Sequence, residues 1–246
     1  MYDVINIGSA TVDALVKTEF CEMLHGKNKK DCIAYPVGSK ILIKELILTI
    51  GGGGTNTAVA LSRLGHKTAF LGKIGTRENS RRIINKLKEE KVNTSLIIRS
   101  KTGRTGYSIV LDSKEHDRTI LSFRGSNSDL KFSEINLKKL EAKWFYFSSL
   151  MGTSFKTLEK MANYAKKNNI KIAFNISSYL AKKGKNYLKN ILKKTNILVL
   201  NKEEASILVG KSNARKSKIS GTNFVGIKNL LKKLNKLGPD IIAITN

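Results

Sequence analysis

Four consecutive glycines, Gly51 to Gly54, stand directly before Thr55 and Asn56. Such a run is rare in a folded domain, because each glycine loses more backbone freedom on folding than any other residue. The apolar residues 47–50 before it predict a strand, and residues 57–64 predict a helix closed by Gly65. At a turn between strand and helix, a ligand can approach the backbone closely and meet unpaired N–H groups. A flexible linker is the alternative, but apolar elements on both sides favour a ligand site.

The glycine run matches neither of the two familiar phosphate-binding motifs. The dinucleotide pattern G-x-G-x-x-G needs a glycine where Asn56 or Thr57 stands, and no Lys-Ser or Lys-Thr closes a P-loop here. A near match to the P-loop ends at Lys211-Ser212, but it lacks the first glycine and follows a predicted helix. We therefore expect a ligand site of another kind at the glycine run.

An acidic residue, Asp13, comes shortly after the first predicted strand, residues 4–8, which is nearly all apolar. Open α/β sheets bind ligands just beyond the carboxyl ends of their strands. Asp13 is therefore a candidate ligand-binding residue, with a role as a turn or helix cap as the alternative.

Asn201 and Glu204 follow another apolar strand, residues 197–200, and begin a predicted helix. Asn201 is a good N-cap, and Glu204 stands at the capping-box position, so a purely structural role explains both. A magnesium site is the second interpretation, since Mg²⁺ keeps several waters and needs few protein oxygens.

The elements that position these residues follow a plain order. From residue 143 to residue 245, apolar strands alternate with amphipathic helices, which predicts a parallel sheet covered by helices on both faces. Residues 35–50 predict two short strands outside that sheet, and residues 105–111 and 118–123 predict a hairpin with period-2 patterning. Residues 18–34 are polar and predict irregular structure.

Composition limits the class of protein. The chain has 246 residues and 41% hydrophobic content, enough for one sizeable domain. No apolar run reaches the ~18 residues that span a membrane, and no signal peptide is evident, so we expect a cytoplasmic protein. The net charge is +26, but lysine pairs recur once per predicted helix without interleaved aromatic residues, which argues against nucleic acid as the main partner. Cys21 and Cys32 flank His25, and we expect ordinary thiols there because a structural zinc site wants four ligands.

The glycine run resembles the first signature of the ribokinase/PfkB family of carbohydrate kinases, in which paired glycines, an Asn and a small residue open a helix. The residues with matching spacing are Gly51, Gly52, Gly54, Asn56, Ala58, Gly65 and Gly75. Residues 8–13 resemble that family's first strand, residues 118–127 its R-T-I-L … R-G-A-N stretch, and residues 201–204 its N-x-x-E motif. The chain departs from the family after Gly75, where the usual Asp is missing, and at Thr11, where ribokinases often carry Asn.

The resemblance implies a ribokinase-like, doubly wound α/β fold with a small β lid formed by strands at about 35–50 and 105–123. It implies transfer of a phosphoryl group from ATP to a hydroxyl of a sugar or nucleoside, with Mg²⁺ as cofactor, and a homodimer formed through the lid. The residues that it assigns to the substrate are Asp13, Gly52, Gly53 and Asn56. Those that it assigns to the nucleotide and magnesium are Asn201, Glu204 and Thr245, with Glu204 acting on the metal through water.

The family's second signature, a Gly-Ala-Gly-Asp turn that carries the catalytic base, has no counterpart in residues 1–246. The resemblance therefore implies a kinase domain that ends before its catalytic turn, with the catalytic Asp expected beyond Asn246, and we expect no turnover by this chain. Three alternatives stay open. They are a nucleoside kinase of the same family, a non-catalytic sugar-binding remnant and a basic nucleic-acid-binding protein.

Overall fold

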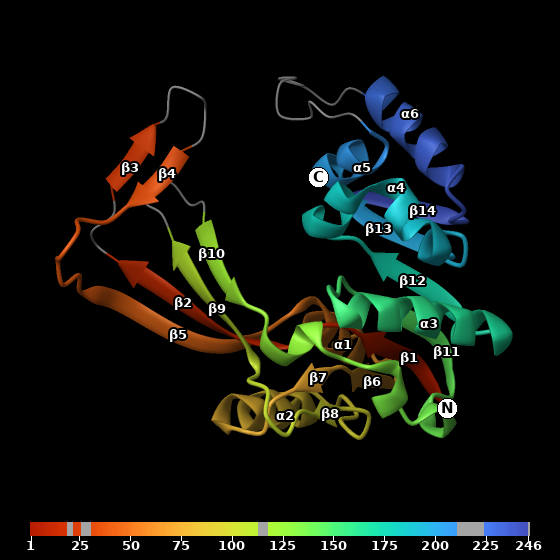
Figure 1. The fold of residues 1–246 in the computed structure, drawn as a ribbon, viewed down its shortest axis with the longest axis horizontal. Coiled ribbons are helices and arrows are strands. Elements are labelled where there is room, and N and C mark those ends of the chain that lie inside the picture. The colour runs from red at the N-terminus through yellow and green to blue at the C-terminus, as the bar shows by residue number, and fades with distance from the viewer. Residues whose placement is uncertain (19–21, 26–30, 113–117, 211–223, 246) are drawn as a thin grey trace.

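The protein consists of a main sheet of six strands with helices packed on it, and an outer sheet of four strands that projects to one side (Figure 1). The computed structural model describes residues 1–18, 22–25, 31–112, 118–210 and 224–245. None of the helices in these ranges is long and apolar enough to cross a membrane.

The main sheet is parallel throughout, with the strand order β14-β13-β12-β11-β1-β6. Its strands are β1 (Tyr2–Ile7), β6 (Thr68–Leu71), β11 (Ala142–Phe147), β12 (Lys171–Asn175), β13 (Ile197–Asn201) and β14 (Ile241–Thr245). From β1 the sheet grows to β6 on one side and to β11 and its successors on the other. This reversal is the doubly wound arrangement, and it confirms the predicted fold class.

Helices α3 (Thr153–Lys167), α4 (Ser178–Leu192), α5 (Lys202–Leu208) and α6 (Phe224–Asn235) occupy the connections from β11 to β14. Successive right-handed crossovers in one direction put these helices on one face, where Phe147, Phe174 and Leu200 are fully buried. Helix α1 (Gly53–Arg63) packs on β1 and β6, and its connection runs the opposite way, so it covers the other face there. The side chains on that face of β11 to β14, such as Trp144 and Ile197, are partly exposed.

The outer sheet has the order β10-β9-β2-β5, with strands β2 (Thr11–Thr18), β5 (Ile43–Gly51), β9 (Gly106–Asp112) and β10 (Arg118–Phe123). The hairpin predicted from residues 105–123 is confirmed as the antiparallel pair β9–β10. The two short strands predicted for residues 35–50 are wrong, since the single strand β5 pairs with β2 along its whole length. The polar pair Lys44-Glu45 does not interrupt β5, because the side chains of this part of the strand are exposed and polar groups there stay in contact with water.

The structure also differs from the sequence-based prediction in the segment before β5. Residues 18–34 hold the small antiparallel pair β3 (Glu22–His25) and β4 (Asp31–Ala34) instead of being irregular. Gly72 separates β6 from the short strand β7 (Lys73–Ile74), which pairs with β8 (Ile98–Arg99). Helix α2 (Glu78–Glu89) follows Gly75 and buries Ile83 and Leu87.

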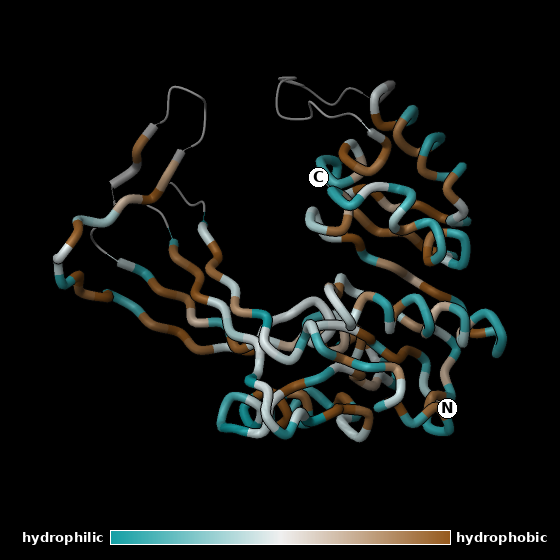
Figure 2. Tube along the Cα trace, in the orientation of Figure 1, coloured by the Kyte–Doolittle hydropathy of each residue, from teal (hydrophilic) through white to brown (hydrophobic). Residues whose placement is uncertain are grey.

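The outer sheet is apolar to an unusual degree for an exposed surface, as the brown strands at the left of Figure 2 show. One end of one face packs on α2 through Val12 and its neighbours. Farther out, large apolar side chains are exposed on both faces. These are Leu15, Ile43, Leu46, Ile47, Leu48, Ile109, Ile120, Leu121 and Phe123.

Candidate active site

The predicted substrate residues and the predicted phosphate residues lie at the same edge of the main sheet, because its parallel strands all end there. β1 ends at Ile7, β11 at Phe147, β13 at Asn201 and β14 at Thr245. The strand order reverses between β1 and β11, and doubly wound sheets bind ligands in the crevice at such a switch point. The glycine turn from β5 to α1 lies beside this point, since residues 8 and 9 at the end of β1 contact it.

The first N–H groups of α1 are bound to Ser9, so the expectation that they are unpaired is wrong for three of them. The N–H groups of Gly54 and Thr55 both donate to the Ser9 carbonyl oxygen, at 3.1 and 3.3 Å. The N–H of Gly53 donates to Ser9 Oγ at 3.2 Å. The chain leaving β1 crosses the start of the helix and satisfies groups that a helix cannot satisfy internally.

Close packing of the protein itself explains most of the glycine run. A Cβ on Gly54 would lie 2.7 Å from the Phe70 ring and 2.8 Å from the Gly8 backbone. Gly52 has φ 101°, a conformation that favours glycine, and a Cβ there would lie 2.5 Å from the Ser9 carbonyl oxygen. These two glycines therefore let α1 approach the end of β1 more closely than any larger residue would.

Asp13 lies beside the glycine turn, as expected, but in an element that the sequence did not predict. It is the third residue of β2 in the outer sheet, not part of a loop after β1, and it pairs with Thr49 of β5. Thr11 Oγ1 donates to Asp13 Oδ1 at 2.8 Å. A Cβ on Gly51 would overlap the other oxygen, Oδ2, so the carboxylate lies directly over the start of the glycine turn.

Ser148 is a candidate site residue that sequence reasoning missed. It follows the last residue of β11, is 2% exposed, and its Oγ has no hydrogen-bond partner among the described residues. A Cβ on Gly53 would lie 2.9 Å from Ser148 Cβ, so this hydroxyl borders the glycine turn. The signal that identified Asp13, a polar residue just beyond a buried strand, applies to Ser148 equally. Asn56 lies in the first turn of α1, directly after the glycine run, and its side chain is exposed.

The capping box predicted for Asn201 and Glu204 is present. The Glu204 N–H donates to Asn201 Oδ1 at 2.8 Å, and the Asn201 N–H donates to Glu204 Oε2 at 2.9 Å. Ser178 Oγ donates to Glu204 Oε1 at 3.1 Å, and Glu204 is 8% exposed. Thr245, the last residue of β14, pairs with Asn201 and is exposed. The structural role of the pair is thus established, and a role toward magnesium stays a prediction.

A buried lysine stabilises the segment behind the site. Lys73 is 5% exposed, and its Nζ donates to Glu134 Oε1 at 2.8 Å and to Asp129 Oδ2 at 3.1 Å. Burial lowers the pKa of Lys73, but the hydrogen bonds and charges of Glu134 and Asp129 outweigh it and hold the pKa above its ordinary value. Lys73 therefore stays charged and ties β7 to residues 129–134.

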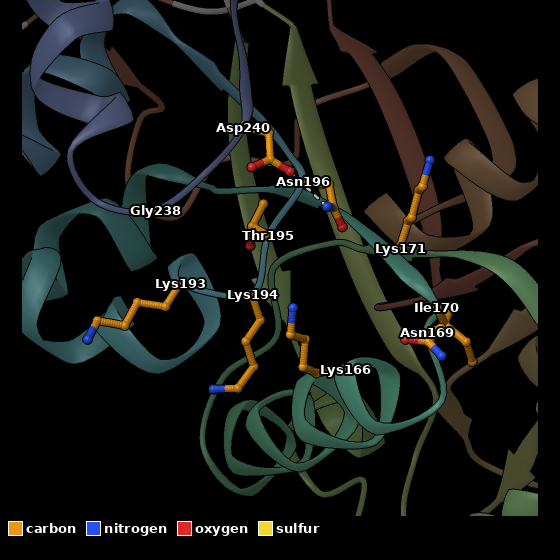
Figure 3. Close-up of a pocket in the computed structure, with 10 residues that line it drawn as sticks. All are labelled: Lys166, Asn169, Ile170, Lys171, Lys193, Lys194, Thr195, Asn196, Gly238 and Asp240. Atoms are coloured by element: carbon orange, nitrogen blue, oxygen red, sulfur yellow. Dashed lines mark hydrogen bonds between the residues drawn. The ribbon is translucent and has the colours of Figure 1, made fainter.

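The cavity in Figure 3, of about 230 Å³, lies at the opposite edge of the sheet from the glycine turn. It is lined by the residues that precede β12, β13 and β14, and Asn196 Nδ2 donates to Asp240 Oδ2 at 2.8 Å across it. Its lysines do not converge on one point. Lys194 Nζ donates to the Asn190 carbonyl oxygen, and Lys171 Nζ lies 5.4 Å from the centre of the Trp144 ring. Two of the four lysines that line the cavity, Lys171 and Lys194, therefore contact other groups of the protein.

Among the described residues, no three His, Cys, Asp or Glu side chains are close enough to share a metal ion. Cys32 is exposed, whereas Cys21 lies outside the described residues. Asn246 lies outside them as well, and the catalytic Asp expected beyond Asn246 therefore stays a prediction from the sequence.

A family model described as pfkB family carbohydrate kinase matches residues 23–246. The chain belongs to this family. Similar curated proteins are the ribokinases of Staphylococcus aureus and Haemophilus influenzae. The first is 27% identical over 207 residues, 82% of this chain and 66% of the relative. The second is 30% identical over 166 residues, 66% of this chain and 52% of the relative.

Solved structures show the same fold for the pfkB-family chain. The Arabidopsis thaliana ribokinase complexed with ribose and ATP superposes with a TM-score of 0.76 at 20% identity, covering 99% of this chain and 71% of that one. The Methanocaldococcus jannaschii nucleoside kinase gives 0.73 at 19% identity, covering 100% and 71%. A probable fructokinase-5 of Arabidopsis thaliana is 32% identical over 103 residues, 41% of this chain and 32% of the relative. Of these three curated relatives, the chain spans about a third to two thirds of the length.

Proposed function

We propose that this pfkB-family chain binds a sugar at the glycine turn and Mg·ATP beyond β13 and β14, to serve phosphoryl transfer from ATP to a sugar hydroxyl. The observation that carries the proposal is the Asp13 carboxylate, held over Gly51 at the switch point of the sheet. The family match and the ribose and ATP of the Arabidopsis ribokinase structure support the same class of reaction.

The sugar side of the site offers an acceptor and a neutral hydroxyl. Asp13 Oδ1 accepts the Thr11 hydroxyl, so the second carboxylate oxygen is left to accept from a sugar hydroxyl. Ser148 Oγ, buried and without a partner among the described residues, supplies a further group that donates or accepts. In this proposal the glycines of the turn and Asn56, exposed in the first turn of α1, are the further residues that contact the sugar.

The phosphate side fits a magnesium ion bound through water. Each oxygen of Glu204 already accepts one hydrogen bond, and a carboxylate oxygen has room for a second, which a metal-bound water can donate. The Mg²⁺ ion would neutralise charge on the nucleotide phosphates. Asn201 holds the carboxylate of Glu204 in place through the capping box, and Thr245 adds a hydroxyl on the neighbouring strand.

The distance between the sugar side and the magnesium side of the proposed site suits a phosphate chain that runs from one to the other. β13 and β1 are separated by β12 and β11, so their ends lie three strand spacings apart. At ~4.8 Å per spacing this is about 14 Å. Phosphoryl transfer depends mainly on positioning and charge stabilisation, which strand ends and turns can provide.

The outer sheet serves in this proposal as the lid and as the surface for a homodimer. On the face of Asp13, the next side chains outward are Leu15, Ile47, Val110 and Ile120, which are paired neighbours on four strands. The opposite face exposes Leu46, Leu48 and Leu121. Apolar area of this kind is normally covered by a ligand or by another chain.

The apolar band next to Asp13 favours a nucleoside as a second candidate substrate. An aliphatic surface can pack on a base, whereas a sugar alone would use polar contacts. A cavity of about 270 Å³ is lined by Leu15, Ile47 and Val110 on this face.

The test is calorimetric titration of the chain with a panel of pentoses, hexoses and nucleosides, and with ATP in the presence and absence of Mg²⁺. Saturable binding of one class of substrate, and ATP binding that depends on Mg²⁺, would support the proposal. Absence of binding to every member of the panel would contradict it. The expected lack of turnover stays a prediction, and a coupled assay for ADP release checks it.

A further inference from the structure

The junction between the two sheets is a three-residue segment, residues 8–10, that leads from β1 to β2. Both backbone groups of Ala10 in this segment are bound by one distant side chain. The Ala10 N–H donates to Asn127 Oδ1 at 2.9 Å, and Asn127 Nδ2 donates to the Ala10 carbonyl oxygen at 2.9 Å. Both bonds are buried and join residues 117 positions apart. Asn127 is 4% exposed.

The chemistry of this pairing requires an amide side chain. A carboxamide carries one acceptor oxygen and a donor NH₂, so it can satisfy an N–H and a C=O of the same residue together. An aspartate at position 127 could accept from the Ala10 N–H, but its second oxygen would face the Ala10 carbonyl oxygen. Because the site is buried, that unmatched pair would be costly.

Asn127 is itself fixed to the main body. It lies in a short 3-10 turn, Gly125–Ser128, where the Ser126 N–H donates to the Arg104 carbonyl oxygen at 2.8 Å. Three residues on, the Leu130 N–H donates to Ser154 Oγ of α3 at 2.8 Å, and Leu130 accepts from Thr157 Oγ1 at 2.7 Å. The buried Lys73 holds Asp129 from the other side.

The outer sheet leaves room for this side chain. Gly106 begins β9 next to Thr11, and a Cβ on Gly106 would overlap Asn127 Nδ2 and lie 2.9 Å from Thr11 Cγ2. Gly106 and Asn127 therefore act as a pair. The glycine opens the space that the amide fills.

We propose that Asn127 is a positioning residue, which fixes the junction between the sheets and thereby places Thr11 and Asp13 over the glycine turn. Ser9 binds the start of α1 and Ala10 binds Asn127, so the junction is held on both sides. Thr11 follows at once and orients the Asp13 carboxylate. The hydrogen bonds that fix the junction do not depend on a ligand, whereas the expected effect on sugar affinity rests on the proposed function.

The first test is amide hydrogen exchange on Asn127→Asp, without any ligand. We expect exchange at residues 10–13 to rise by about tenfold or more, with unchanged protection of Ile172 and Phe174 in the main sheet. Asn93→Asp is the matched control, because Asn93 Oδ1 only accepts, from the Ser95 N–H and hydroxyl, and an aspartate keeps both bonds. Unchanged exchange at residues 10–13, or an equal rise throughout the chain, would overturn the proposal.

A second pair of variants tests the link to Gly106. Gly106→Ala should displace the amide and reproduce the local exchange pattern of Asn127→Ala. In the double variant, the free energy of protection lost at residues 10–13 should be smaller than the sum of the losses in the two single variants. The reason is that Asn127→Ala has already removed the amide that Gly106→Ala would displace. Strict additivity of the two would refute the pairing.

The ligand test compares the affinity of wild type and Asn127→Asp for a substrate identified in the panel. We expect about tenfold weaker binding by the variant at a temperature where both are folded, and unchanged binding by Asn93→Asp. Equal affinity of Asn127→Asp and wild type would overturn the positioning role. If wild type binds no member of the panel, the proposed function fails, and the exchange results alone decide whether Asn127 clamps the junction.

Discussion

Replacing Asp13 with asparagine tests the sugar site with a single change of charge. The amide has nearly the shape of the carboxylate, and its oxygen can still accept the Thr11 hydroxyl, as Asp13 Oδ1 does at 2.8 Å. The group over Gly51 becomes a donor NH₂ in place of an acceptor oxygen. The bond to the substrate that requires an acceptor is therefore lost, whereas the bond within the protein is kept.

The size of the effect follows from the charge of the lost partner. A hydrogen bond to a charged group contributes about 1.5–3 kcal/mol, and each 1.4 kcal/mol is a tenfold change in affinity. Asp13→Asn should thus weaken sugar binding by about 10- to 150-fold. The folding stability should change little, because Asp13 is only half-buried in β2.

Calorimetric titration with the best substrate of the panel, together with urea unfolding, measures both quantities. Asp3→Asn is the control, since Asp3 lies at the opposite edge of the sheet, where it accepts from the Lys67 N–H at 2.9 Å. An affinity of Asp13→Asn within twofold of wild type would refute the assigned role. Global unfolding of the variant would show that the carboxylate is structural instead.

Three further predictions concern the other parts of the site and its scaffold. Glu204→Gln keeps an oxygen that can accept from the Asn201 N–H, so the unfolding midpoint should change little, whereas Mg²⁺-dependent ATP affinity should fall about tenfold; a loss of stability without a loss of affinity would favour the cap as the only role. Gly54→Ala should destabilise the fold by about 1–3 kcal/mol in urea unfolding, because its Cβ would press on Phe70 and Gly8, whereas Gly226→Ala, in open space on α6, should not. Hydrogen bonds from Arg63 and Lys86 lower the pKa of Glu90 from its ordinary value of 4.5 to about 2. The stability from Glu90 is therefore present above pH 4.5 and lost as the pH falls toward 2, and Glu90→Gln should flatten the acid dependence of unfolding in this window, while Glu89→Gln should leave it steep.

The sequence by itself determined the elements whose causes are local. The helix end at Gly65 is such a case, because its φ of 89° and its N–H bond to the Ser62 carbonyl oxygen depend on residues within one turn. The capping box of Asn201 and Glu204 is another, since both of its bonds span three residues. The alternation of strands and helices after residue 143 predicted the parallel sheet correctly, because burial on the sheet imposes an apolar pattern on each strand.

Only the tertiary structure decided what the glycine turn contacts. Its helix start is bound by Ser9, 44 positions away for the Gly53 bond, and so the free N–H groups expected from the local pattern are taken. Asp13 lies beside the glycine turn, but it belongs to a strand of the outer sheet that no local pattern had indicated, and its role toward a sugar stays a prediction. Ser148 borders the glycine turn, and Asn127 binds the junction at Ala10, from segments about 95 and 75 residues beyond the turn. Such contacts depend on which strands pair and on how closely the sheets approach, and residue spacing along the chain contains no information about either.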